Sequence, residues 1–196
     1  CRKVARKVVD KGKKHSTKVG VDDLKEFLGI PKYQRLPANK PLPVGVATGL
    51  AWTEVGGELL SIEVTVLPGS GKLSPTGKLG DVMKESAHAA LSYVRSRAKD
   101  FGLKKDFYQK TDIHIHIPEG AVPKDGPSAG ITMAIAMVSA LTKNPLRHDV
   151  AMTGELTLTG KVLSIGGLKE KSLAAHRGGI FKMILPKENE KDIPEI

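Results

Sequence analysis

The pattern of apolar and polar positions divides the chain into a helical beginning and a longer part in which strands and helices alternate. Residues 1–10 place three valines near one face of a predicted helix. A second short helix is predicted after the N-cap candidates Asp22 and Asp23, and Gly29 closes it. Four prolines then fall between residues 31 and 43, which is typical of a linker. The predicted boundaries are a helical segment 1–34, a linker 35–43 and a main domain 44–196.

The main domain begins with a period of two, which predicts β-strands. Strands are expected over residues 46–54 and 58–67, joined by a turn at two successive glycines. Residues 112–117 alternate cleanly, with three isoleucines on one face and with His114 and His116 on the other. This pattern predicts a sheet with one buried face and one polar face.

Later segments predict helices packed against that sheet. Helices are expected over residues 81–98, 128–141 and 167–177, and the second contains no charged residue. A helix that is apolar on all sides is buried, so residues 128–141 should form the central helix. Further strands are predicted over residues 150–153, 155–159, 162–165 and 181–185, with Asn189 as the cap of a final helix. Together these elements predict an α+β fold with mixed sheets around a buried central helix.

Charge is concentrated at the beginning of the chain. The net charge is +10, and residues 1–40 hold 12 Lys or Arg against 4 Asp or Glu. A basic segment can bind nucleic acid electrostatically. It lacks the interleaved aromatic residues on which bases stack, so a solvated helix face is the preferred interpretation. A non-catalytic DNA-binding module centred on residues 1–40 is kept as an alternative.

Cysteine usage and hydropathy indicate the compartment. Cys1 is the single cysteine, which excludes disulfides within the chain and favours a reducing environment. The chain has no signal-peptide core at its beginning and no apolar run of about 18 residues. We expect a cytoplasmic protein with no membrane partner. An amphipathic helix that starts at residue 1 indicates a fragment of a longer chain.

The segment 123–130 places Ser128 at the beginning of the predicted central helix. Pro127 suits a first helical turn because its missing N–H has no helical partner there. Helix N-termini present free N–H groups and a partial positive charge. The backbone around Gly126, Pro127 and Ala129 is therefore a candidate oxyanion site for a reaction at Ser128. The alternative is a serine that only helps to cap a buried helix.

A lysine on the last predicted helix is the candidate base. One face of that helix carries Leu168, Lys171, Ser172 and Ala175 at helical spacing. Lys171 therefore lies on the stripe that faces the core, whereas Lys169 should face solvent. Burial lowers the pKa of a lysine, and a neutral amine can take the proton of Ser128. The alternative is a lysine whose ammonium reaches past the apolar stripe to water.

Residues 126–130 also match the G-x-S-x-G pattern of α/β-hydrolases. In that motif a strand runs directly into the serine, but here ten residues (118–127) intervene. Asp149 and His176 follow the serine in the order that such a triad requires. A Ser-His-Asp esterase or hydrolase is therefore kept as an alternative.

Two further motifs are considered for phosphate and metal binding. Residues 68–73 resemble a phosphate loop but lack the glycine at position 66 and the Ser or Thr at position 73. We expect a flexible loop there. His114 and His116 share a strand face and could begin a metal site, but no third ligand has supporting spacing. We predict no metal and a polar strand face with Glu63 as a neighbour.

The chain resembles the proteolytic domain of the Lon protease family, of the bacterial type. The similarity covers roughly residues 40–196. The segments that carry it are residues 49–57, 80–86, 123–130, 144–147, 150–155 and 166–177. The resemblance implies an α+β fold of the family's own, unlike the doubly wound hydrolases. It also implies a serine endopeptidase with a Ser-Lys dyad.

The resemblance assigns roles to individual residues. Ser128 falls on the nucleophile of the family, Lys171 on its general base and Thr153 on the threonine that helps hold the amine. The positions that match residues lining or supporting the active site are Glu63, His114, His116 and Asp125.

The resemblance also implies properties of a longer protein. Lon proteases are ATP-dependent, assemble as hexameric rings, and degrade damaged and short-lived regulatory proteins. Residues 1–34 would be the end of the preceding ATPase domain, and the family's extreme C-terminal end would be missing. ATP and Mg²⁺ would then be held outside this sequence, and we expect no cofactor within it.

Overall fold

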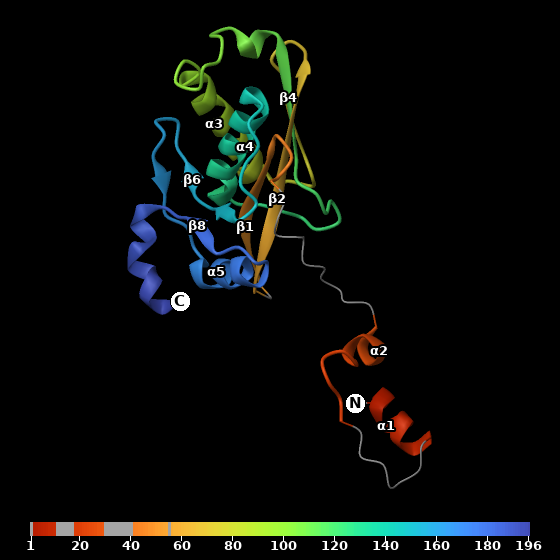
Figure 1. Cartoon of the computed structure of the whole chain (residues 1–196). Coiled ribbons are helices and arrows are strands. Elements are labelled where there is room, and N and C mark those ends of the chain that lie inside the picture. The colour runs from red at the N-terminus through yellow and green to blue at the C-terminus, as the bar shows by residue number, and fades with distance from the viewer. Residues whose placement is uncertain (1, 11–17, 30–40, 55) are drawn as a thin grey trace. The chain divides into compact units, whose positions relative to one another are not determined.

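The computed structural model describes residues 2–10, 18–29, 41–54 and 56–196 (Figure 1). The chain divides into two compact units, Cys1–Leu36 and Pro37–Ile196. Most of the predicted linker at residues 35–43, and Cys1 itself, lie outside the described residues.

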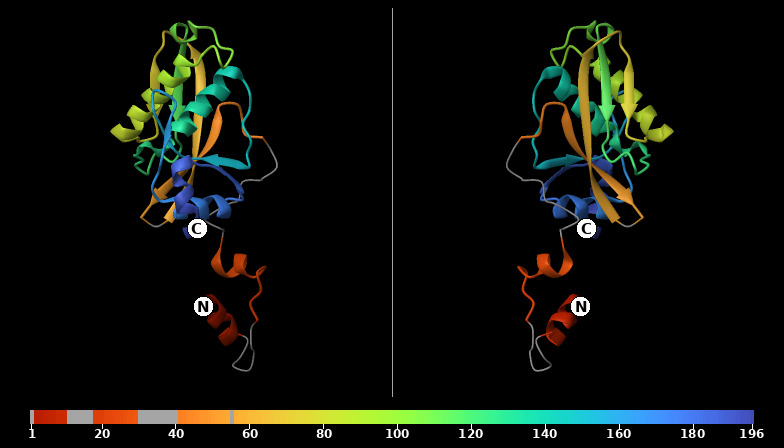
Figure 2. Two further views of the ribbon diagram at one scale, coloured as in Figure 1. Left: turned by 90° about the vertical axis from the view of Figure 1, so that its left-hand side faces the viewer. Right: turned by 90° about the vertical axis from the view of Figure 1, so that its right-hand side faces the viewer.

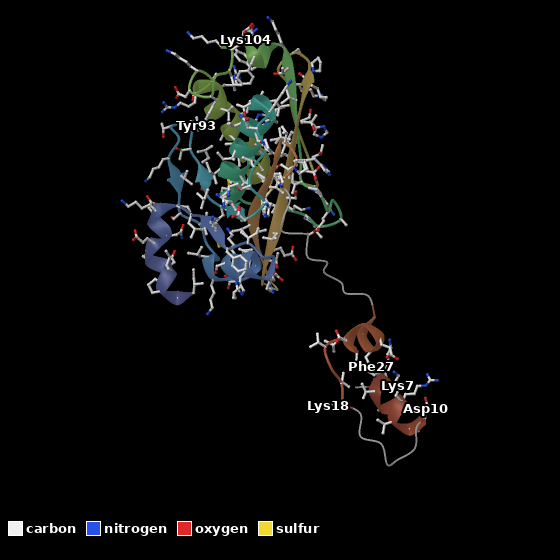
Figure 3. All side chains as sticks on the ribbon, viewed as in Figure 1. Lys7, Asp10, Lys18, Phe27, Tyr93 and Lys104 are labelled. Atoms are coloured by element: carbon white, nitrogen blue, oxygen red, sulfur yellow. The ribbon has the colours of Figure 1, made fainter. Side chains whose placement is uncertain are left out.

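The N-terminal unit contains helices α1 (Arg2–Asp10) and α2 (Leu24–Leu28), as the sequence predicts. No residue of α1 is buried. Lys7 pairs with Glu26 and lies 4.9 Å from the ring centroid of Phe27; Figure 3 labels Lys7 and Phe27. An exposed ion pair and a cation–π contact each contribute about 1 kcal/mol or less, so this unit lacks a core of its own among its described residues.

The larger unit is built on a six-stranded sheet in the order β3-β4-β2-β1-β5-β8. The strands are β1 (Val46–Thr53), β2 (Gly56–Pro68), β3 (Leu73–Thr76), β4 (Thr111–His116), β5 (Val150–Met152) and β8 (Lys182–Ile184). The pairs β1–β2 and β2–β4 are antiparallel, and the other three pairs are parallel. A separate hairpin is formed by β6 (Glu155–Leu156) and β7 (Val162–Leu163).

Helices α3 (Asp81–Ser96) and α4 (Gly130–Thr142) pack on one face of this sheet. The main core joins Met133 and Met137 of α4 to alternate residues of the central strands. Those strand residues are Leu60, Ile62, Val64, Ile113 and Ile115. The predicted α+β fold with a buried central helix is therefore confirmed, and α4 is that helix.

Helix α5 (Leu168–Arg177) packs on the opposite face. Leu50 alternates with the core-facing residues of β1 and joins a second cluster with Ala151, Ala175 and Ile180. Figures 1 and 2 show α5 beside the hairpin end of β1 and β2. The two faces of the sheet are therefore covered by different helices, one by α4 and the other by α5.

Three details differ from the predictions. The two glycines expected in the β1–β2 turn are strand residues, because Gly56 pairs with Thr53 and Gly57 pairs with Trp52. The strand predicted at residues 181–185 as buried is instead the sheet edge β8, next to an exposed Phe181.

Asn189 is the third difference, because it caps no helix. It lies inside the 3-10 helix η3 (Lys187–Glu195), and its side chain bonds both the N–H and the carbonyl of Ile165. From sequence alone, an asparagine whose buried amide bonds to a distant backbone segment looks the same as an asparagine that caps a helix.

No helix within the described ranges is long and apolar enough to cross a membrane.

Candidate active site

Ser128 lies in the 3-10 turn η2 (Pro127–Ala129), directly before α4. The regular α-helix begins at Gly130, two residues later than the sequence predicts. Gly126 precedes the turn with φ of 120° and ψ of 156°, a conformation that residues with a Cβ rarely adopt. Glycine is therefore favoured at this position, and the serine two residues later is half-buried.

Asp125 fixes the segment that leads to this turn. Its Oδ1 accepts hydrogen bonds from the N–H groups of Met83 and Gly126, both at 2.9 Å. The N-cap of α3 is Gly80, which has no side chain to cap the helix. A Cβ at Gly80 would lie 2.2 Å from the Asp125 carboxyl carbon. The Asp125 carboxylate thus caps α3 and ties the Ser128 segment to it.

Lys171 projects from α5 toward Ser128. Its side chain is inward-facing, as the helical spacing predicts, and the residue is only 2% exposed. Lys169, two positions earlier, is exposed to solvent. The Nζ atom of Lys171 lies 3.2 Å from the Oγ of Ser128 and 3.2 Å from the Oγ1 of Thr153. The structure therefore brings these three side chains together.

Thr153 connects the lysine to the backbone of the serine. It follows β5 and is 1% exposed. Its hydroxyl donates to the carbonyl of Ser128 at 3.3 Å, and the N–H of Gly154 donates to the same carbonyl at 2.7 Å. Gly154 was not singled out by the sequence; its place just after a buried strand is the signal that could have found it.

Burial lowers the pKa of Lys171 from its ordinary value of 10.5 to about 8. No carboxylate lies within ion-pair distance of it among the described residues. Its polar partners are hydroxyl groups, which do not offset the lost hydration of a charge. At pH 7 about a tenth of such an amine is neutral, against about three in ten thousand for an ordinary lysine.

The structure leaves fewer candidate oxyanion donors than the sequence predicts. Pro127 has no N–H to donate. The N–H of Gly126 is directed to the Asp125 carboxylate. The N–H groups of Ser128 and Ala129 remain as candidates at this turn, because the first turn of a helix leaves its donors without helical partners.

His114 and His116 belong to a different group of polar side chains. The Oγ1 of Thr76 lies 2.9 Å from the Nε2 of His114 and 2.8 Å from the Nδ1 of His116. Both histidines alternate with the buried isoleucines, so they lie on the sheet face opposite α4. Glu63 pairs with His116 across β2 and β4 and is exposed.

No hydrogen bond between described residues links Thr76, His114 or His116 to the group around Ser128. Thr76, His114 and His116 therefore form a hydrogen-bonded group of their own, and a supporting role for the two histidines stays a prediction. Thr76 was not predicted, since only the parallel pairing of β3 with β4 brings it beside the histidines.

The glycine loop at residues 68–73 is closed by an acidic side chain. The N–H groups of Ser70, Gly71 and Lys72 all donate to the Oδ1 of Asp112, at 2.8, 3.0 and 2.9 Å. The loop backbone is thus bonded to a side chain of β4, and its flexibility stays a prediction. The same donors cannot bind a phosphate while the carboxylate holds them, so this loop does not fit ATP. Within the described part of the chain, no three His, Cys, Asp or Glu side chains are grouped as metal ligands.

The alternative triad is not assembled. His176 is exposed on α5, and its ring meets the edge of Phe181 at 5.6 Å between centroids. Asp149 pairs with Arg147 at 2.6 Å and with Lys182 at 3.5 Å. These cations hold the pKa of the Asp149 carboxyl well below its usual range. The geometry therefore gives no support to a Ser-His-Asp mechanism.

Comparison with known proteins agrees with the resemblance. A family model described as the Lon protease (S16) C-terminal proteolytic domain matches residues 18–196. The whole chain is 61% identical to a Lon protease of Solibacter usitatus, and 60% identical to one of Nitratidesulfovibrio vulgaris. It is 59% identical to Lon protease 1 of Syntrophobacter fumaroxidans. The chain spans about a quarter of the length of these relatives (25%, 24% and 24%). The family match over most of its length shows that this chain belongs to the Lon protease (S16) C-terminal proteolytic domain family.

Proposed function

We propose that the chain is a serine endopeptidase in which Ser128 is the nucleophile and Lys171 is the general base. The observation that carries the proposal is a buried amine, without a carboxylate partner among the described residues, 3.2 Å from a serine hydroxyl. A serine becomes nucleophilic only when a nearby base takes its proton. The pKa of about 8 gives Lys171 an appreciable neutral fraction near physiological pH.

The steps follow from this pair. The neutral Nζ accepts the hydroxyl proton as Oγ forms a bond to the substrate carbonyl carbon. The carbonyl oxygen takes the electron pair of the double bond and becomes an oxyanion. As the tetrahedral species collapses, the carbon–nitrogen bond breaks, and the Lys171 ammonium gives its proton to the leaving amine. An acyl-enzyme remains. The neutral Lys171 amine then deprotonates a water molecule whose oxygen bonds to the acyl carbon. As the carbon–Oγ bond breaks, the Lys171 ammonium returns its proton to Oγ, which releases the acid and restores Ser128.

The other residues of the site act on these two. Thr153 holds the amine in line with Ser128 and limits its rotation. The N–H groups of Ser128 and Ala129 are the proposed oxyanion donors, and one such donor is typically worth about 3–4 kcal/mol of barrier. Asp125 acts indirectly, because it fixes the turn that carries the serine.

We further propose that the chain works within a longer ATP-dependent protease. The family match and the name of the relatives support this proposal. ATP and Mg²⁺ would be bound by an ATPase portion that these 196 residues do not contain. The substrates would be misfolded and short-lived regulatory proteins, the assembly a hexamer, and the compartment the bacterial cytoplasm.

Three variants and one trapping experiment test the chemistry. Ser128→Ala, Lys171→Ala and His176→Ala are compared on a fluorogenic peptide at matched concentration and assembly state. We expect the first two to be inactive and the third to cleave at nearly the rate of the parent chain. Mass spectrometry after incubation with a peptide ester should place the acyl group on Ser128. An active Lys171→Ala variant beside an inactive His176→Ala variant would overturn the proposal.

A further inference from the structure

The first turn of α5 packs against Gly57 of the sheet. This glycine lies near the start of β2 and is buried. A Cβ at this position would lie 2.1 Å from the carbonyl oxygen of Glu170, 2.5 Å from its carbonyl carbon and 3.0 Å from the backbone nitrogen of Lys171. Because all three neighbours are helix backbone, no side-chain rotation could relieve such an overlap.

The same glycine also contacts the other end of the helix. Its carbonyl oxygen accepts a hydrogen bond of 2.8 Å from the Nη2 of Arg177. Residues 170 and 177 are seven positions apart, so they lie on one side of α5, about two turns from each other. Gly57 is thus in contact with both ends of the helix face that covers the hairpin.

Trp52, the strand partner of Gly57, meets the residue before α5. Gly167 has φ of 68°, and a Cβ there would lie 2.7 Å from the Cδ1 of Trp52. The end of the hairpin therefore limits where α5 begins as well as how closely it approaches. Lys171 is four residues beyond Gly167, and its N–H donates to the Gly167 carbonyl at 3.0 Å.

We propose that Gly57 is a positioning residue for Lys171: by having no side chain, it sets how closely α5 approaches the sheet. That approach determines both the distance from Nζ to Ser128 and the exclusion of water from the amine. The inference rests on the proposed Ser128–Lys171 chemistry. It gives Gly57 a role apart from the hairpin turn in which the sequence placed it.

The direct test is Gly57→Ala. The added methyl group displaces the first turn of α5 outward, which lengthens the Nζ–Oγ distance and admits water. Misplacement of a catalytic group by about 1 Å costs roughly a hundredfold in rate, so we expect at least a tenfold loss of peptide cleavage at pH 7. The midpoint of the pH–rate profile should move upward from about 8, because hydration favours the charged form of Lys171.

Two further variants separate positioning from general damage. Gly166→Ala is the matched control, since a Cβ there meets no atom within 4 Å; it should keep the parent rate and midpoint. Arg177→Met removes the second contact without adding bulk. It should move the midpoint in the same direction as Gly57→Ala, by less. If circular dichroism shows that Gly57→Ala does not fold, Arg177→Met decides the question.

The pKa of Lys171, followed by NMR with ¹³C-labelled lysine, is a readout independent of activity. Its resonance is assigned as the signal missing from Lys171→Met. An upward shift of the pKa in folded Gly57→Ala and in Arg177→Met, absent in Gly166→Ala, supports the positioning role. Unchanged pKa values and rates in both variants would overturn it. If Ser128→Ala and Lys171→Met still cleave peptide, the proposed chemistry fails instead, and the NMR shifts still report whether Gly57 seats the amine.

Discussion

Two groups of polar side chains in this molecule have similar bonds and very different surroundings. In one, Lys171 binds the hydroxyls of Ser128 and Thr153 at 3.2 Å each. In the other, the hydroxyl of exposed Thr76 lies 2.9 and 2.8 Å from nitrogen atoms of His114 and His116. We call these the buried group and the exposed group.

Burial, rather than hydrogen bonding, distinguishes the two groups. In the exposed group, water can replace any bond that is lost. One hydroxyl has one proton, so Thr76 can donate to only one of its three neighbours, the two imidazoles and the carbonyl of Ile115, at a time. In the buried group, water is excluded from a cation that has hydroxyl partners and no carboxylate partner among the described residues. Its pKa falls to about 8 for that reason.

The largest expected effect is the loss of the buried amine. Lys171→Met should lower the rate of peptide cleavage by about a thousandfold or more, because general base catalysis typically contributes 10²–10⁴. Lys169→Met, on the exposed side of the same helix, is the matched control and should keep the parent rate. Comparable losses in the two variants would remove the distinction between buried and exposed lysines.

Thr153→Val keeps the shape of the side chain and removes its hydroxyl. The amine then loses one of its two hydroxyl partners. Because a buried hydrogen bond left incomplete costs about 1–3 kcal/mol, we expect a loss in rate of roughly 10- to 100-fold. Thr153→Ser should restore most of the rate. Steady-state kinetics should place the loss in kcat, and an effect confined to KM would argue that Thr153 contacts substrate instead.

The same lysine should destabilise the fold at neutral pH. The folded pKa of about 8 lies below the ordinary 10.5, so the unfolded chain binds more protons between these two values. Stability should therefore rise as pH increases from about 8 to about 10.5. Lys171→Met should increase the free energy of unfolding at pH 7 by about 1–3 kcal/mol, measured in urea.

Lys171→Met should also lack the rise in stability between pH 8 and pH 10.5, which makes each denaturation series its own control. A variant that is less stable than the parent chain at pH 7 would contradict the view that this buried charge is costly.

The smallest expected effects belong to the exposed group. Thr76→Val and His116→Ala should each change the free energy of unfolding by about 0.5 kcal/mol or less, as is usual for surface positions. Their peptide cleavage rates should stay within roughly threefold of the parent chain, since no bond between described residues joins this group to the buried one. A tenfold or larger loss would show that both groups serve one site.

The sequence predicted Ser128 and Lys171 of the buried group better than it predicted Gly57 and Thr76. Spacing along one helix places Lys171 on the apolar stripe, and a charge-free segment identifies the helix that follows Ser128; both are local signals. Gly57 and Thr76 act through partners about 40 to 110 residues away, which no period within one element can reveal. Two adjacent glycines match a turn motif whether they form the turn or lie in the paired strand after it. Only the register of β1 with β2 shows that Gly56 and Gly57 are strand residues.

Lys171 should be excluded from water beside Ser128, and a direct titration of its amine tests this arrangement. The parent chain, labelled with ¹³C at the lysine ε-carbon, would be followed by NMR from pH 6 to pH 12, with Lys171→Met to assign the signal. We expect one lysine to titrate near pH 8, well separated from the others. A Lys171 signal that titrates near 10.5, together with the other lysines, would show that the amine is hydrated and would contradict its proposed role as the general base.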